Sequence, residues 1–475
     1  MRKWLLCSAV LMLLLSLTGC GGIQQEKVVE VTLPEEAEEE ENGSGTVVSD
    51  ICIYEYEVAL DEAARTQLEN LRKYRKTAEE YDAGWLKLGD IFARNGLAQA
   101  GFSGEDVWLS SRTAEGTVTV RTLDMEYGFY ETLWEEELET GTEKIWVSPD
   151  GTKRLILHES EEEGRVCLDR VDSEGKTCRI LTGESGWDGE AWWGLQCVWS
   201  GDSSRAFLRL CPSIYFPESW GEWDADDEEN YSYWDEYADS ALLTPSSPCE
   251  IWMLEGETAN LSATCVLDTS ASSELWRPQM AVSWDGSAVF QTLSGGDAAV
   301  MELMNQWPEQ TASVYLWEED GVWSSVQNED WAMDEEGDRI GEDLVSVSRD
   351  VCLWEDLVCV LNFEGEYLLW DTASGTTQNF GKMHGSDLKR FIYFCAEDTV
   401  EERIYAVSDS DLYYMEYGED GTWEMISVYR GPSDADLVDI TVQPETGDIL
   451  LNYLLGGLDA ADGDTLEMQL VLLKF

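Results

Sequence analysis

The stretch IWVSPDGTKRLIL at residues 145–157 contains a complete hairpin: an apolar strand, a Ser-Pro-Asp-Gly turn and a second apolar strand. Related stretches follow at residues 198–207 (VWSGDSSRAF) and 282–290 (VSWDGSAVF), with weaker copies at 345–350 and 440–450. Short apolar runs bounded by Gly, Pro, Asp and Ser are typical of strands joined by tight turns. The repetition predicts an all-β protein built from several copies of one small sheet unit.

A second hairpin also recurs in the chain. The stretch YLWEEDGVW at residues 315–323 matches YMEYGEDGTW at 414–423, and both place Asp-Gly between aromatic residues. Asp-Gly suits the positive φ angles of a type I′ turn, and the flanking aromatic residues favour strands. Between these copies, YLLWDTASG at residues 367–375 carries a Trp-Asp pair before a turn.

These turns resemble those of a known fold. Ser148-Pro149-Asp150-Gly151 resembles the strand–turn signature of TolB-like and WD40-like β-propellers, and Trp370-Asp371 resembles the WD dipeptide. The resemblance covers most of residues 140–475 and implies four-stranded antiparallel blades arranged radially around a channel. Because the copies are unevenly spaced and only one has the complete turn, we expect six or seven blades.

The chain ends in a predicted strand, residues 466–475, with no sequence left to supply a following partner. We expect an N-terminal strand, such as Thr117–Leu123, to complete that last blade. Closing the ring in this way removes exposed sheet edges, which are a liability in any open sheet.

The first residues predict export from the cytoplasm. A positively charged start precedes an apolar run over residues 4–17, which is too short for a permanent transmembrane helix. Leu17-Thr18-Gly19-Cys20 resembles the lipobox of bacterial lipoproteins, which implies cleavage before Cys20 and a diacylglyceryl group on its thiol. An ordinary secretory signal is the alternative. We expect a lipid anchor on the outer face of the bacterial cytoplasmic membrane, or on the outer membrane of a Gram-negative cell.

The chain divides into four parts by composition. Residues 1–19 are a predicted lipoprotein signal peptide, and residues 20–50 form an acidic flexible tether. Residues 51–101 hold a strand and then a short helical segment from Asp61, and residues 102–475 form the predicted propeller.

Charge restricts the partners of this chain. Its 475 residues carry a formal net charge of −67 at pH 7. Such a surface repels nucleic acid and anionic lipid head groups, so we expect no nucleic acid partner and membrane attachment only through Cys20. It attracts basic proteins and cations. The alternative explanation, which we favour from composition alone, is solubility and salt tolerance on an exposed cell surface.

An insertion at residues 212–248 splits the second recognisable repeat and combines acidic and aromatic residues. Aromatic faces beside carboxylates can stack on sugar rings, enclose a cationic ligand or help to bind Ca²⁺. The spacing lacks the Gly and terminal Glu of an EF-hand loop. The alternative is a surface flap that covers a blade edge. The candidate ligand surface is Trp220, Trp223, Asp224, Asp226, Asp227, Tyr233 and Trp234.

Twelve cysteines, of which Cys7 and Cys20 belong to the signal region, permit disulfides in an exported protein. Two pairs flank predicted hairpins, and Cys352 with Cys359 is a further possible pair; buried free thiols are the alternative. With no CxxC motif and only two histidines, we expect no zinc site. The candidate disulfide cysteines are Cys167 with Cys178 and Cys249 with Cys265.

No residue constellation identifies a reaction. The chain has no Gly-x-Ser-x-Gly elbow, and 97 acidic residues make any choice of a glycosidase pair arbitrary. We therefore expect a cell-envelope binding or scaffolding module for a basic protein, a glycan or a cation, without catalytic activity and without a cofactor other than possible Ca²⁺. The alternative is a secreted carbohydrate-active hydrolase. Acidic residues that converge in one cleft would favour the enzyme. Acidic residues spread around the rim would favour the binding module.

Overall fold

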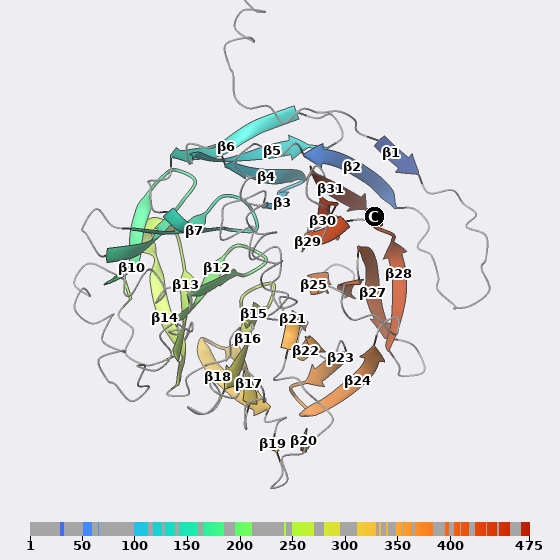
Figure 1. The fold of residues 1–475 in the computed structure, drawn as a ribbon. Coiled ribbons are helices and arrows are strands. Elements are labelled where there is room, and N and C mark those ends of the chain that lie inside the picture. The colour runs from blue at the N-terminus through green and yellow to red at the C-terminus, as the bar shows by residue number, and fades with distance from the viewer. Residues whose placement is uncertain are drawn as a thin grey trace, which may run out of the picture.

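A computed structural model shows that the chain folds into a ring of antiparallel sheets (Figure 1). Six four-stranded sheets, blades 1 to 6, and a five-stranded closing sheet surround a common axis. The expected all-β propeller with four-stranded antiparallel blades is confirmed. The structure describes residues 29–32, 51–58, 65, 99–112, 117–125, 129–137, 142–159, 165–184, 195–210, 242–243, 249–269, 280–294, 311–328, 332–333, 339–340, 348–354, 356–362, 366–382, 395–398, 403–408, 410–417, 423–433, 435–443, 446–456 and 467–475.

Each blade pairs four strands in sequence order, so that every connection joins adjacent strands. Blade 1 consists of β3 (Ala100–Ser103), β4 (Asp106–Arg112), β5 (Thr117–Asp124) and β6 (Phe129–Glu137). Blade 2 consists of β7 (Thr142–Val147), β8 (Arg154–Glu159), β9 (Arg165–Val171) and β10 (Thr177–Glu184). Blade 3 consists of β11 (Gln196–Trp199), β12 (Arg205–Leu210), β13 (Cys249–Glu255) and β14 (Ser262–Thr269), with the 3-10 turn η5 (Thr258–Asn260) between the last two.

The remaining blades follow the same pattern. Blade 4 consists of β15 (Met280–Val282), β16 (Ala288–Ser294), β17 (Thr311–Glu319) and β18 (Val322–Asn328). Blade 5 consists of β21 (Ser348–Trp354), β22 (Leu357–Asn362), β23 (Glu366–Asp371) and β24 (Thr376–Lys382). Blade 6 consists of β25 (Cys395–Asp398), β26 (Arg403–Ser408), β27 (Asp411–Tyr417) and β28 (Trp423–Tyr429). The short strands β19 (Ala332–Met333) and β20 (Arg339–Ile340) pair separately between blades 4 and 5.

The core is divided among the interfaces between blades. In β12, Ala206 and Leu208 join an apolar cluster shared with blade 2, whereas Phe207 joins one shared with blade 4. Successive strand residues point to opposite faces, so a strand covered on both faces needs apolar residues at nearly every position. This explains why the central strands are apolar runs and why each blade depends on both of its neighbours.

The closing sheet joins the two ends of the described chain. Its order is β1 (Val29–Thr32), β2 (Cys52–Val58), β31 (Glu467–Lys474), β30 (Ile449–Leu455) and β29 (Ala435–Val442). Strand β2 pairs with the C-terminal strand along its whole length, with Ile53 opposite Leu473. An N-terminal strand thus completes the last sheet, as the edge argument predicts.

The strand expected to close the ring is not the one that does so. Thr117–Leu123 lies in β5, where β4 and β6 already occupy both of its edges. The segment from residue 51, assigned by sequence to a lead-in before the propeller, is part of the ring instead. Its alternation fits this position, because Ile51 and Ile53 are buried while Cys52 is exposed.

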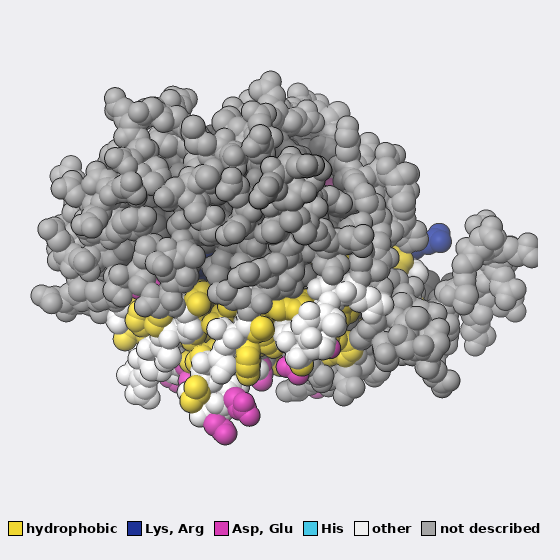
Figure 2. Space-filling view, turned by 90° about the horizontal axis from the view of Figure 1, so that it is seen from below, with side chains coloured by type: hydrophobic (Ala, Val, Ile, Leu, Met, Phe, Trp, Pro, Cys, Tyr) yellow, Lys and Arg dark blue, Asp and Glu magenta, His cyan; other side chains and the backbone are white. Residues whose placement is uncertain are grey.

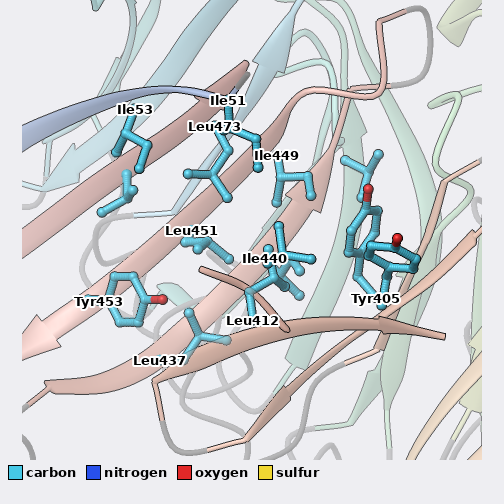
Figure 3. Packing of buried hydrophobic residues seen from close by; sticks show 14 of the residues in the cluster. Ile51, Ile53, Tyr405, Leu412, Leu437, Ile440, Ile449, Leu451, Tyr453 and Leu473 are labelled. Carbon is cyan, nitrogen blue, oxygen red and sulfur yellow. The ribbon is translucent and has the colours of Figure 1, made fainter. Parts of the chain in front are cut away.

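Figure 3 shows how the closing sheet packs against blade 6. Ile51 and Ile53 of the N-terminal segment lie with Leu473 and Ile449, and Tyr405 of blade 6 lies across the same cluster. Burial of these side chains, each at most 4% exposed, stabilises the closure by the hydrophobic effect. The signal peptide and, apart from Arg65, the expected helical segment from Asp61 lie outside the described residues. Of the residues assigned to a flexible tether, only Val29–Thr32 are described, and they form β1 of the closing sheet.

Candidate functional site

The turns between the first and second strands of blades 2, 3 and 4 share one internal structure. In blade 2, Ser148 Oγ donates to Asp150 Oδ1 at 2.5 Å, and the backbone N–H of Thr152 donates to the same oxygen at 3.0 Å. The carboxylate therefore organises the turn by accepting local hydrogen bonds. Blades 3 and 4 repeat the Ser–Asp contact with Ser200 and Asp202 at 2.6 Å, and with Ser283 and Asp285 at 2.9 Å.

These turns lie on one face of the ring, because hydrogen bonds from a turn, or from the strand that follows it, reach the turn of the next sheet. Four such bonds connect the closing sheet and blades 1 to 4: Gln443 Nε2 to Gly104 O at 2.9 Å, Trp108 Nε1 to Pro149 O at 2.7 Å, Asp150 N to Ser203 Oγ at 2.9 Å, and Asp202 N to Trp284 O at 3.0 Å. The repeated turn thus contributes to the joining of blades as well as to the reversal of the chain.

Arg205 strengthens the joint between blades 3 and 4. Its Nη1 donates to the carbonyl oxygen of Gly286 at 3.0 Å and to Glu318 Oε2 at 2.6 Å. Its Nη2 lies 2.9 Å from Glu255 Oε1 in its own blade. The Arg205 side chain is only 16% exposed, so these charge-assisted bonds are partly shielded from solvent.

The same face carries many exposed carboxylates. In each four-stranded antiparallel blade, the third and fourth strands are joined at the same end as the first and second. In Figure 2, acidic side chains project from the lower edge of the described part of the molecule. We define the acidic turn face as the exposed acidic residues in or beside these turns: Glu105, Asp106, Glu174, Asp202, Glu257, Asp285, Glu319 and Asp320.

Basic side chains on the acidic turn face are already engaged. Lys153 donates from Nζ to the carbonyl oxygen of Ser203 at 3.0 Å, and exposed Lys176 lies 2.5 Å from Glu174. The described carboxylates spread over several blades, and no three His, Cys, Asp or Glu side chains among the described residues gather as a metal site would require. The described part of this face is therefore a diffuse acidic rim.

A polar cluster crosses three strands within blade 2. His158 Nε2 lies 2.9 Å from Asp169 Oδ2, and the Arg179 guanidinium forms an ion pair with the same carboxylate. Arg179 Nη1 also donates to the sulfur of buried Cys167 at 2.8 Å. Burial raises the pKa of the Asp169 carboxyl, but hydrogen bonds from His158 and Arg179 outweigh that effect and hold the pKa below its ordinary value.

Arg170 is a buried cation between blades 2 and 3. It is fully buried, and none of its three guanidinium nitrogens has a hydrogen-bond partner among the described residues. Its Cζ lies 5.7 Å from the centroid of the Trp199 ring, and the carboxylates of Glu257 and Asp172 attract it at longer range. Burial lowers the pKa of Arg170. The role of Arg170 was not predictable from sequence, because a single arginine in an apolar strand forms no recognisable pattern.

The predicted ligand surface lies outside the described residues, as does Cys20. All seven residues of the candidate ligand surface, the first of which is Trp220 and the last Trp234, are outside the described part of the chain. Within the insertion only residues 242 and 243 are described: the N–H of Leu243 donates to Ile180 O at 2.9 Å, and Leu243 is buried in the cluster between blades 2 and 3. These two residues cover the outer edge of β10. Among the described residues, no helix has the length and apolar character needed to cross a membrane.

The strand register does not favour the two expected disulfides. Cys178 lies opposite Arg170 in β9, three residues from Cys167, which is about 10 Å along the strand. Cys265 lies opposite Trp252 in β13, again three residues from Cys249. A disulfide needs Cα atoms within about 7 Å, so either bond would require the strands to move. Sequence spacing placed both pairs near the same hairpin but did not determine the register.

Comparisons with known proteins identify no family. No family model matches the chain, and no curated protein matches it. A structure from a study of two prolyl endopeptidases is similar at 12% identity and a TM-score of 0.43, over 83% of this chain and 52% of that one, so the chain spans about half of its length.

Two further solved structures are similar at the same low level. The β-propeller domain of the Trilobed protease from Pyrococcus furiosus matches at 10% identity and a TM-score of 0.37, over 75% of this chain and 88% of that one. A catalytically inactive virginiamycin B lyase from Staphylococcus aureus matches at 10% identity and a TM-score of 0.38, over 80% of this chain and 94% of that one. This level of similarity says nothing about what the chain binds or catalyses, and the fold rests on the strand pairing described above.

Proposed function

We propose that the protein is a lipid-anchored, extracytoplasmic binding or scaffolding module that holds a basic protein partner on the acidic turn face. The observation that carries this proposal is the exposure of eight carboxylates from four consecutive blades on one side of the ring. A field of one sign over a broad surface attracts an oppositely charged macromolecule and orients it before contact.

The chemistry of the face favours a basic protein over the other expected ligands. A bound cation needs several oxygen ligands around one point, whereas the carboxylates described here are distributed over several turns. Nucleic acid would be repelled by the net charge of −67. A glycan would need aromatic faces, and the sequence offers these at Trp220, Trp223 and Trp234 in the insertion. The insertion is thus the candidate surface for a glycan.

The attachment to the membrane is supported by sequence alone. Leu17-Thr18-Gly19-Cys20 resembles a lipobox, and residues 21–28 connect Cys20 to β1 of the closing sheet. A Cys20→Ala variant should leave the membrane fraction and appear in the soluble envelope fraction. A Cys7→Ala variant is the matched control and should stay membrane-bound. Equal membrane retention of both variants would contradict the anchor.

The binding proposal is tested with a lysine-rich peptide of defined length and the chain without its signal peptide. A face variant carries Glu105→Lys, Glu174→Lys, Glu257→Lys and Glu319→Lys. A matched control reverses four exposed carboxylates away from these turns: Glu57→Lys, Glu135→Lys, Glu137→Lys and Glu467→Lys. We expect the face variant to lose at least about tenfold in affinity, equivalent to about 1.4 kcal/mol, and the control to lose much less.

The salt dependence gives a second measurement. Exposed charges are screened, so the affinity of the unmodified chain should fall as ionic strength rises, and the face variant should depend less on salt. Equal losses in both variants would show that only net charge matters and would refute a specific face. Hydrolysis of an arrayed glycan by the purified chain would instead support an enzyme.

A further inference from the structure

Cys352 and Cys359 lie directly opposite each other in the β21–β22 hairpin of blade 5. The register between them and the turn is unbroken, with Leu353 opposite Val358 and Trp354 opposite Leu357. Residues directly opposite in an antiparallel pair point to the same face of the sheet, with Cα atoms about 4.5–5.5 Å apart. Disulfides join Cα atoms about 4.4–6.8 Å apart. The strand pairing therefore places the two cysteines at bridging distance.

Both side chains lie inside the blade. Cys352 is 6% exposed and Cys359 is fully buried. The thiol of Cys352 donates a weak hydrogen bond to the carbonyl oxygen of Leu353 at 3.7 Å. Their face is opposite the one on which Val358 packs against blade 4, so a bond between the sulfurs would leave that interface unchanged.

We propose that Cys352 and Cys359 form an intrablade disulfide when the chain folds in the presence of a low-molecular-weight disulfide oxidant. One thiolate attacks the oxidant and forms a mixed disulfide with release of one small thiol. The second cysteine then displaces the other small thiol and closes the protein bond. Two protein thiols lose two protons and two electrons in total, and the oxidant is reduced to two thiols.

Blade 5 differs in this respect from blades 2 and 3. In blade 2, Cys167 lies opposite His158 and Thr182, and Cys178 lies opposite Arg170, so neither cysteine faces another one on a neighbouring strand. In blade 3, Cys265 lies opposite Trp252 and not opposite Cys249. The register thus selects one pair from the described cysteines and distinguishes it from pairs with similar spacing in the sequence. The bond between Cys352 and Cys359 does not depend on whether a partner binds at the acidic turn face.

The test begins with the unmodified chain. The chain is unfolded in urea under reducing conditions, refolded in a buffer of oxidised and reduced glutathione, and treated with N-ethylmaleimide. Trypsin then releases residues 350–382, which contain Cys352 and Cys359 and no other cysteine. We expect this peptide to be unlabelled and two hydrogens lighter than its dithiol form, and to accept two labels after reduction. Two labelled cysteines in the folded, oxidised chain would overturn the proposal, as would a bond to a different cysteine.

A second measurement does not depend on refolding. The chain is secreted into the periplasm of host strains with and without the thiol oxidase that forms disulfides, and the same peptide is analysed. The bond should be present in the first strain and reduced severalfold or lost in the second. Cys352→Ser and Cys359→Ser should each abolish the oxidant-dependent rise in the thermal midpoint, whereas the matched control Cys178→Ser should retain it. A rise that persists in both hairpin variants would contradict the assignment.

Discussion

Blades 2 to 4 are joined by polar contacts between turns in addition to shared apolar clusters, whereas the closing sheet is completed by strand pairing between the two ends of the described chain. Between blades 2, 3 and 4, short polar contacts connect consecutive turns, such as Asp150 N to Ser203 Oγ at 2.9 Å. The closing sheet instead pairs β2 with β31 and buries Ile53 and Leu473. The polar joints are built from a repeated sequence, whereas the closure joins chain segments more than 400 residues apart. The difference shows that local turn chemistry can repeat from blade to blade, but closing the circle requires apolar burial and strand pairing at the ends.

The largest effect is expected at the closure. Ile53→Asp places a carboxylate among buried apolar side chains and weakens the pairing of β2 with β31. Such a change should lower the free energy of unfolding by about 3–5 kcal/mol, measured by urea titration followed by Trp fluorescence. Cys52→Ser on the same strand is the matched control, because Cys52 is exposed, and should change stability by less than about 0.5 kcal/mol. Similar midpoints for both variants would show that the ring does not depend on this strand.

A smaller loss is expected in the turn of blade 2. Gly151 has φ of +74°, and a Cβ atom there would lie 2.9 Å from the ring of buried Trp108 in blade 1. Gly151→Ala should therefore cost about 2–4 kcal/mol, from backbone strain and the displaced ring together. Gly175 has a similar φ of +77° but nothing within 4 Å, so Gly175→Ala should cost only about 1–2 kcal/mol. Equal losses would mean that the contact with Trp108 contributes nothing.

The next smaller loss of stability is expected from Arg205, at the polar contact between blades 3 and 4. Arg205→Met removes two ion pairs and a hydrogen bond to Gly286 and leaves Glu318, whose side chain is 19% exposed, without its cation. We expect a loss of about 1–3 kcal/mol. Lys176→Met breaks an exposed ion pair with Glu174 and should leave the stability almost unchanged. If Lys176→Met destabilised the chain as much as Arg205→Met, the shielded joint would have no special importance.

The smallest expected effect is an acid dependence within blade 2. Because the pKa of Asp169 is lower in the folded chain than in the unfolded chain, Asp169 stabilises the fold above its unfolded pKa of about 4. That stabilisation is lost as pH falls from about 4 through the lower folded pKa. Asp169→Asn should therefore flatten the decline in stability below about pH 4, measured by urea unfolding from pH 2 to pH 6. An unchanged decline would assign acid sensitivity to other carboxylates.

The hairpins were predictable from sequence because their signals are local. Ser148, Pro149, Asp150 and Gly151 determine a turn within a few residues, and the alternation around it determines two strands. The acidic character of the surface was equally predictable, since composition alone gives the sign of the field. Arg170 and the contacts of Arg205 were not predictable, because their environments consist of residues from neighbouring blades.

The strand–turn unit, its repetition and the need for an N-terminal strand to cover the last edge were all predictable from local sequence patterns. The identity of this strand depends on the assembled ring, because both Thr117–Leu123 and the segment from Ile51 alternate suitably, but β4 and β6 occupy both edges of the first, whereas the second pairs with β31. The register was decided in the same way. Cysteine spacing suggested three similar pairs, and the hydrogen-bonded pairing of strands places only Cys352 and Cys359 opposite each other, because register depends on both strands together.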